Sequence, residues 1–238
     1  MKKFLCLLAS VATLFLTACA TNPQYPVSLS HGELVRGEKV GIYIDKLPEV
    51  NTGFPGADCL LCIGVASAAH TALTAHVKSL SADDFLTVAE GLNNEISRVG
   101  SSVVPIEESI NFRKLPKHKT KELNFAKKNF SSFKKKYDIG SLLVIDINAI
   151  GVHRGYASYV PTGDPQAVLL GTAYMVDLET NAYRWYKPIS IYRSAEGDWK
   201  EKPSYPGLTN AFYQVIEQGK DEILSPFRAV EPVSQSED

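Results

Sequence analysis

The chain has little net charge, which removes one class of ligand. Its 238 residues carry 25 Lys and Arg against 26 Asp and Glu, a formal net charge of −1. The chain lacks the excess of positive charge that nucleic-acid-binding proteins carry, so we expect no nucleic-acid partner. Long apolar runs are scarce as well. The run from Phe4 to Leu16 would form a helix of about 20 Å, shorter than the ~30 Å hydrocarbon core, and does not predict a permanent transmembrane helix.

Catalytic signatures are also scarce. The sequence has no H-E-x-x-H, no G-x-S-x-G and no phosphate-binding glycine loop, and its five histidines are scattered. Ser131-x-x-Lys134 matches the nucleophile motif of penicillin-recognising enzymes, but the companion motifs S-D-N and K-T-G are missing. Asp146, Asn148 and His153 would serve a hydrolase only if a cleft brought His153 to a carboxylate or a nucleophile. We therefore expect no enzymatic activity, no cofactor and no metal site.

The N-terminus has the pattern of a secretory leader followed by a lipid-attachment site. Lys2 and Lys3 precede the apolar run, and Leu16-Thr17-Ala18-Cys19 places a cysteine after two small residues. This lipobox pattern, typical of bacterial lipoproteins, predicts a signal peptide over residues 1–18 and a lipid on the thiol of Cys19. An ordinary signal peptide cut nearby, which would leave an unanchored protein, is the alternative.

The residues that follow predict where the protein lies and how it is divided. By resemblance to Gram-negative lipoproteins, Ala20 carries no inner-membrane retention signal, which implies an outer-membrane protein that we expect to face the periplasm. Several acyl chains would hold it there stably. Residues 19–38 are polar and contain Pro23 and Pro26, which predicts a flexible tether. We expect residues 39–228 to form one domain and residues 229–238 an acidic, disordered tail.

The stretch from Cys59 to Leu80 is nearly uncharged and predicts an apolar helix inserted into the domain. Such a helix would pack on the domain or on a sister subunit, contact the membrane, or help to hold zinc. Cys59, Cys62, His70 and His76 are candidate zinc ligands, but on one continuous helix the first and last lie about 25 Å apart. Cys59 and Cys62 could instead form a disulfide. A redox role is disfavoured, because this lone CxxC lacks a thioredoxin-like context.

A block of basic residues occupies positions 113–136, with Glu122 as its single acid. Apolar residues recur there every three or four positions, which predicts an amphipathic helix with a basic outer face. That face is a candidate patch for anionic lipid headgroups, lipopolysaccharide or peptidoglycan, and the alternative is an ordinary solvated surface. The candidate patch residues are Lys127, Lys128, Lys134 and Lys135.

The remaining pattern predicts an α/β (α+β) domain with one mixed sheet of about five strands and three to four packed helices. Strands are expected over 39–44, 102–106, 142–153, 167–178 and 183–192, with a hairpin turn at 179–182. A helix is expected from a cap at Ser81 to Val99, and another after Thr209. The first half predicts parallel crossovers and the second half an antiparallel meander.

The hairpin carries a resemblance to a known group. Residues 173–181, AYMVDLETN, followed by Trp185, resemble the VDLxTGxxxW hairpin of envelope lipoproteins with the TolB amino-terminal-like fold, which include the curli secretion lipoprotein. Their order of elements, β-α-β-α-β-β-β-α, is similar to the order expected here over residues 39–225. Asn181 stands where the group usually has glycine, and the inserted helix at 59–80 departs from the pattern. The group is mixed in function.

These observations favour a lipid-anchored, non-enzymatic envelope protein. The expected partners are a secretion, export or cell-wall complex of the envelope, or further copies of the same chain. The alternative is a binding module for peptidoglycan, lipopolysaccharide or anionic lipid that uses the basic helix and a cluster of aromatic residues.

Overall fold

The computed structural model describes residues 23–30, 34, 37–120 and 122–228. The helices are α2 (Leu60–Ala69), α3 (Thr71–Lys78), α4 (Val88–Arg98), α5 (Ser132–Tyr137) and α6 (Pro206–Arg228), with 3-10 turns η1 (Asp83–Thr87) and η2 (Phe112–Lys114). The strands are β1 (Lys39–Ile44), β2 (Asn51–Gly53), β3 (Ser102–Pro105), β4 (Ser141–His153), β5 (Tyr156–Ala157), β6 (Val160–Pro161), β7 (Gln166–Asp177) and β8 (Tyr183–Ser194).

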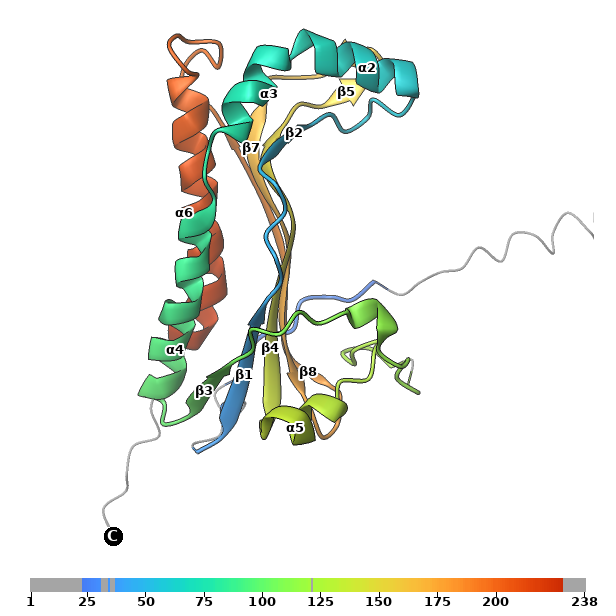
Figure 1. Cartoon of the computed structure of the whole chain (residues 1–238), viewed down its shortest axis with the longest axis vertical. Coiled ribbons are helices and arrows are strands. Elements are labelled where there is room, and N and C mark those ends of the chain that lie inside the picture. The colour runs from blue at the N-terminus through green and yellow to red at the C-terminus, as the bar shows by residue number, and fades with distance from the viewer. Residues whose placement is uncertain (1–22, 31–33, 35–36, 121, 229–238) are drawn as a thin grey trace, which may run out of the picture.

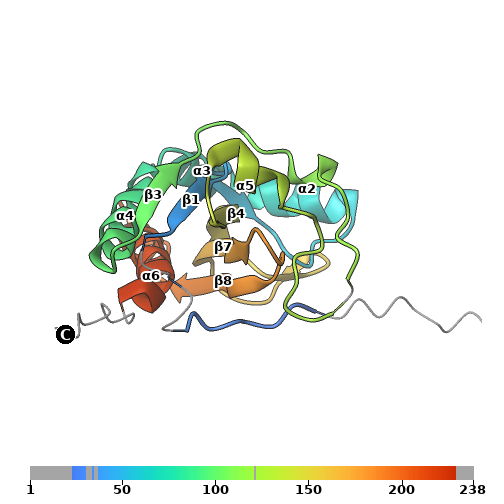
Figure 2. The same cartoon turned by 90° about the horizontal axis from the view of Figure 1, so that it is seen from below.

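One mixed sheet organises these elements, as the sequence predicts. Its strand order is β3-β1-β4-β7-β8, and β2 pairs with the far end of β4. The pairs β1–β3, β1–β4 and β2–β4 are parallel, whereas β4–β7 and β7–β8 are antiparallel. Helices α4 and α6 lie along one face, while α2 and α5 lie at opposite ends of the sheet (Figures 1 and 2). The small hairpin β5–β6 lies beside α2 (Figure 1).

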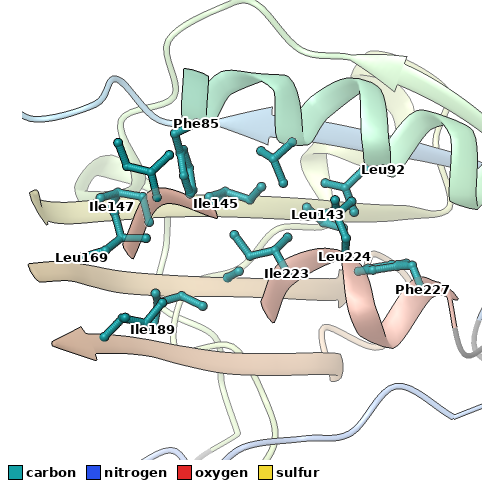
Figure 3. Close-up of a cluster of buried hydrophobic side chains, with 14 of the residues drawn as sticks. Phe85, Leu92, Leu143, Ile145, Ile147, Leu169, Ile189, Ile223, Leu224 and Phe227 are labelled. Carbon is teal, nitrogen blue, oxygen red and sulfur yellow. The ribbon is translucent and has the colours of Figure 1, made fainter. Parts of the chain in front are cut away.

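The core forms on both faces of β4, because residues 142–145 of this strand are a continuous apolar run that is buried on both faces. Leu143 and Ile145 point into the larger cluster, formed with α4, α6 and β7 (Figure 3). Leu142 and Val144 alternate with them and pack against Phe133 of α5 on the other face. A strand buried on both faces belongs in the centre of a sheet, and β4 occupies that place.

The hairpin motif shapes the β7–β8 turn. The Asp177 Oδ1 atom accepts hydrogen bonds from the backbone N–H groups of Glu179 (2.9 Å) and Thr180 (2.8 Å). Asn181 has a φ of +67°, the left-handed conformation that a glycine would adopt at this position. Trp185 is buried in the main core, with its ring centroid 5.3 Å from that of Phe227. These motif residues therefore build and bury the hairpin.

The prediction of a basic helix over 113–136 is wrong. Of the residues that the structure describes in this range, only η2 and the short α5 are helical, and those between them form an irregular loop. Pro116 cannot donate a helical hydrogen bond, and Asn124 adopts a left-handed φ of +64°. The apolar residues Ala126 and Phe130 are buried as their spacing indicated, but they reach the core from the loop. We call residues 112–130 the lysine loop.

The inserted helix at 59–80 is two helices. His70, with φ −121° and ψ 23°, separates α2 from α3. No single helix in the described ranges is long and apolar enough to cross a bilayer; the helical stretches Leu60–Ala69 and Thr71–Arg98 pass that test only as a pair bent by 76°. The next helix also starts later than expected, because η1 precedes α4 and the Ser81 hydroxyl bonds to Asp83.

Part of the expected tether is fixed to the domain. Val27 and Tyr186 of β8 exchange two backbone hydrogen bonds, of 2.9 and 3.0 Å. The Gln24 side-chain amide donates to the Asn124 side-chain oxygen at 3.0 Å. Within the tether expected over 19–38, residues 23–30 therefore contact the domain in the structure. Cys19, the signal peptide at 1–18 and the tail at 229–238 lie outside the described residues.

Candidate functional site

Helix α2 presents an apolar surface to solvent. Leu60 is 92% exposed and Leu61 is 66% exposed, and only Cys62 and Ala66 of this helix are buried. The β5–β6 hairpin extends the surface, since the Tyr159 hydroxyl lies 3.9 Å from the Cys59 sulfur. Six of the eleven exposed large hydrophobic residues in the described chain gather here. We call this group the apolar tip: Leu60, Leu61, Ile63, Val65, Tyr159 and Val160.

The start of α2 is fixed by the two cysteines. Cys59 and Cys62 form a disulfide with their Cα atoms 4.9 Å apart. The Cys59 sulfur also accepts a hydrogen bond from the backbone N–H of Cys62 at 2.9 Å, which caps the first turn of the helix. Ala66, one turn further on, is fully buried in the cluster that also contains Ala57 and Tyr156. The helix is thereby attached along one stripe while its other sides face solvent.

The end of α2 is held by a buried histidine. The His70 Nε2 atom lies 2.9 Å from the Tyr156 hydroxyl and 3.0 Å from Nη1 of Arg154. A guanidinium can only donate, so Nε2 accepts and the ring is neutral. Burial, followed by the charges of Arg154 and Lys200, lowers the pKa of His70 and favours this form. The Arg154 guanidinium also lies 5.1 Å from the Trp199 ring centroid, which ties α2 to the loop before α6.

A pocket of about 650 Å³ opens between β2 and helices α2 and α3. Phe54 and Ile63 supply apolar walls, and Lys78 is the only charged residue among those that line it. None of the lining residues is His, Cys, Asp or Glu. The lining therefore offers no pairing of a general acid with a general base.

The polar residues considered for a hydrolase do not converge. Burial, followed by the charge of Asp45, raises the pKa of Asp146. Burial lowers the pKa of His153, and among the described residues no hydrogen bond joins its ring to a carboxylate. The four residues considered for zinc are not brought together around one point. The two cysteines form their disulfide, His70 binds Tyr156, and the His76 Nε2 atom lies 2.8 Å from the Thr209 hydroxyl.

The four candidate patch lysines have different roles. Lys128 donates to the carbonyl oxygens of Arg113 (2.7 Å) and Leu115 (2.8 Å) and so closes the lysine loop on itself. Lys134 forms an ion pair with Glu179. Lys127 and Lys135 are exposed and form no ion pair within the part of the chain that the structure describes. The patch is therefore not one helix face, and only part of its charge is available to a ligand.

Asn181 clamps the lysine loop, a role that the sequence did not reveal. Its side-chain amide donates to the carbonyl oxygens of Ala126 (2.9 Å) and Lys128 (3.0 Å). Its side-chain oxygen accepts from the backbone N–H of Phe130 at 2.8 Å, and the residue is only 2% exposed. The one signal was an asparagine at a turn position where glycine is usual, since only asparagine adds a side chain that can bind a neighbouring segment.

No protein-family model and no curated protein matches the sequence. Several solved structures are similar over most of the chain, among them the following three. A PelC dodecamer from Paraburkholderia phytofirmans is 13% identical, covers 87% of this chain and 97% of that one, and has a TM-score of 0.30. A protein of the DUF330 family from Xanthomonas campestris is 10% identical, covers 85% of this chain and 90% of that one, and has a TM-score of 0.37. Lipoprotein GNA1162 from Neisseria meningitidis is 11% identical (79% and 99% covered, TM-score 0.32). Likenesses this low establish neither a family nor a function for this chain.

Proposed function

We propose that this chain is a lipid-anchored, non-enzymatic protein of the outer membrane, faces the periplasm, and assembles with an envelope protein complex through the apolar tip. The observation that carries the proposal is the exposure of Leu60 and Leu61 on a helix that is fixed at both ends. Contiguous exposed apolar surface marks contact sites more often than isolated exposed leucines do.

The energetics support assembly. Fully burying one exposed leucine side chain contributes about 1.5–3 kcal/mol, so a partner that covers both leucines gains several kcal/mol. The disulfide and the His70 contacts already order the helix. Because the helix does not need to be ordered on binding, less of that gain is offset by lost conformational entropy.

The composition of α2 favours a protein partner over lipid. Helices that lie in a membrane interface combine an apolar face with a polar face rich in Lys and Arg. The sequence of α2, LLCIGVASAA, contains no charged residue. Its small residues, such as Gly64 and Ala68, allow another helix or strand to approach closely. The partner is then a subunit of an envelope complex, and a second copy of this chain is one outcome of the test.

The location rests on the sequence around Cys19 and is consistent with the cysteine chemistry. The lipobox predicts export and lipid attachment. The disulfide between Cys59 and Cys62 suits an oxidising compartment such as the periplasm. Cys19 is the remaining cysteine of the mature chain, and the proposal assigns it to the lipid.

The proposal is tested with the full-length protein in a Gram-negative envelope. Membranes are fractionated, mild cross-linking is applied, and complexes are resolved by native mass spectrometry. The double substitution Leu60→Asp and Leu61→Asp is expected to remove the complex. Leu86→Asp is the matched control, because Leu86 is 45% exposed on η1, outside the apolar tip.

Two results would contradict the proposal. One is a wild-type protein that forms neither a hetero-complex nor an oligomer, and the other is a complex that survives the double substitution. Thermal denaturation of each variant shows whether the fold is intact. The intact mass of protein extracted from membranes reports separately whether Cys19 carries lipid.

A further inference from the structure

The N-terminal segment and the lysine loop meet at one place on the domain. Gln24 bonds to the Asn124 side chain at 3.0 Å, and the Asn124 carbonyl accepts from the backbone N–H of Tyr183 at 2.7 Å. Three residues after Gln24, Val27 pairs with Tyr186 of the same strand, β8. Both views place residues 23–30 next to the lysine loop (Figures 1 and 2). The chain therefore enters the domain against this loop.

The length of chain before Gln24 limits how far the loop can lie from a lipid on Cys19. Gln24 lies five positions after Cys19. At no more than ~3.6 Å per residue, the two are at most about 18 Å apart. This step rests on the proposed lipidation of Cys19. Given that lipid, the chain is short enough to keep the lysine loop beside the bilayer, where its cations can come within the ~8 Å Debye length over which anionic headgroups attract them.

The charge of the loop suits that position. Residues 112–130 include seven Lys and Arg against one acid, Glu122. Five of these basic residues are exposed and form no ion pair with any described residue: Arg113, Lys114, Lys117, Lys119 and Lys127. On the neighbouring helix α5, Lys134 and Lys136 are paired with glutamates, and Lys135 is not. The unpaired cations are thus concentrated on the segment that the anchor brings to the membrane.

Two exposed hydrophobic residues flank the same contact. Tyr25 follows Gln24 and is 61% exposed, and Leu123 precedes Asn124 and is 51% exposed. A tyrosine beside lysines is typical of surfaces that lie at the level of lipid headgroups, since its ring is apolar and its hydroxyl is polar. The Asn181 clamp holds the loop on the β7–β8 hairpin, so this surface is ordered before any lipid binds.

We propose that the lysine loop binds anionic phospholipid headgroups and forms a second membrane contact beside the lipid on Cys19. Each cationic side chain near a negatively charged surface strengthens binding about fivefold. The contact leaves the apolar tip available. The loop bonds to Tyr183, which pairs with Val176 of β7, and Val176 pairs with Leu142 of β4. Strand β2, which lies below α2, pairs with β4 at Val152. Leu142 and Val152 are ten residues apart along β4, so the lysine loop and the apolar tip are separated by about 33 Å along this strand.

The test uses vesicles and the complete mature-length chain, residues 19–238, with Cys19→Ser so that no lipid contributes. Flotation is measured with vesicles that contain 30 mol% phosphatidylglycerol in phosphatidylcholine, and with phosphatidylcholine alone. We expect binding only to the anionic vesicles, weakened by raising the salt concentration. We expect the combined change Lys117→Glu, Lys119→Glu and Lys127→Glu to weaken binding about a hundredfold or more, because each of the three lost cations contributes a factor of about five.

The matched control carries the same change of net charge elsewhere. Lys46→Glu, Lys78→Glu and Lys202→Glu substitute three exposed lysines outside the loop, and they are expected to change binding by less than about threefold. The inference is overturned if the control weakens binding as much as the loop variant, if neutral vesicles bind equally, or if peptidoglycan sacculi retain the protein while anionic vesicles do not. The intact mass of the native protein reports lipidation of Cys19 independently, so a failure of the anchor and a failure of the loop are separate results.

Discussion

Replacing Asn181 with glycine removes a buried clamp and keeps the turn. Glycine adopts the φ of +67° found at this position at no steric cost. What is lost is the side chain, which makes three hydrogen bonds to the lysine loop. The β7–β8 hairpin is expected to persist, because Asp177 holds the other side of the turn. The substitution therefore isolates the attachment of the loop.

The size of the effect follows from the three bonds. Each net hydrogen bond contributes about 0.5–1.5 kcal/mol, so the set contributes roughly 1.5–4.5 kcal/mol. Glycine relieves the cost of a left-handed non-glycine residue, and it also increases the entropy of the unfolded chain by a comparable amount. These two changes nearly offset each other. We expect Asn181→Gly to lower the free energy of unfolding by about 3 kcal/mol.

Urea denaturation measures the loss, and hydrogen exchange locates it. The amide of Phe130 donates to the Asn181 side chain, and it is expected to exchange faster in the variant. Asn124→Gly is the matched control. Asn124 has a similar φ of +64°, but it is exposed, and its side chain accepts one bond from Gln24. We expect the control to change stability by less than about 0.5 kcal/mol. If Asn181→Gly costs no more than Asn124→Gly, the clamp does not hold the loop.

Three further predictions concern the apolar tip and the core. Burial lowers the pKa of His70 below its ordinary 6.5, so the folded state binds fewer protons than the unfolded state. The free energy of unfolding is therefore expected to fall as pH drops below 6.5. Urea denaturation of His70→Gln is expected to show a smaller fall over the same pH range. Replacing Cys59 and Cys62 with serine is expected to cost at most about 2 kcal/mol, because the closed loop is short, and to raise hydrogen exchange in α2 before the rest of the domain. Gly219→Ala would place a Cβ atom 2.1 Å from the Leu169 Cδ2 atom, so a thermal melt is expected to show a loss of about 1–3 kcal/mol from overpacking.

The sheet and its two long packed helices follow from local patterns. Strands β1, β4, β7 and β8 lie within a few residues of their expected positions. Alternating apolar residues, or a continuous apolar run, indicate a strand that is buried on one or both faces, and this signal is contained in the local sequence. The buried face of α4, from Val88 to Ile96, was evident for the same reason. In α6 the apolar stripe was correct, but the helix begins at Pro206, before the expected cap at Thr209.

The functional surfaces depend on contacts between distant residues, and local patterns do not contain these. Ala126 and Phe130 have helical spacing, yet the partners that decide their backbone conformation are on Asn181, about fifty residues later. The break at His70 depends on Arg154 and Tyr156 in the same way. The N-terminal segment looked like a tether because Val27 pairs with a single residue of β8, which leaves no periodic signal. In each case a tertiary contact overrides the local preference.

A photo-cross-linking residue at position 61 of the full-length protein in living cells shows whether the anchored domain presents the apolar tip to a protein partner. A second such residue at position 86 is the control. We expect one protein adduct of defined mass from position 61, lost when Leu60→Asp is added, and no such adduct from position 86. Adducts with lipid alone at position 61, or the same protein adduct from both positions, would contradict the proposal.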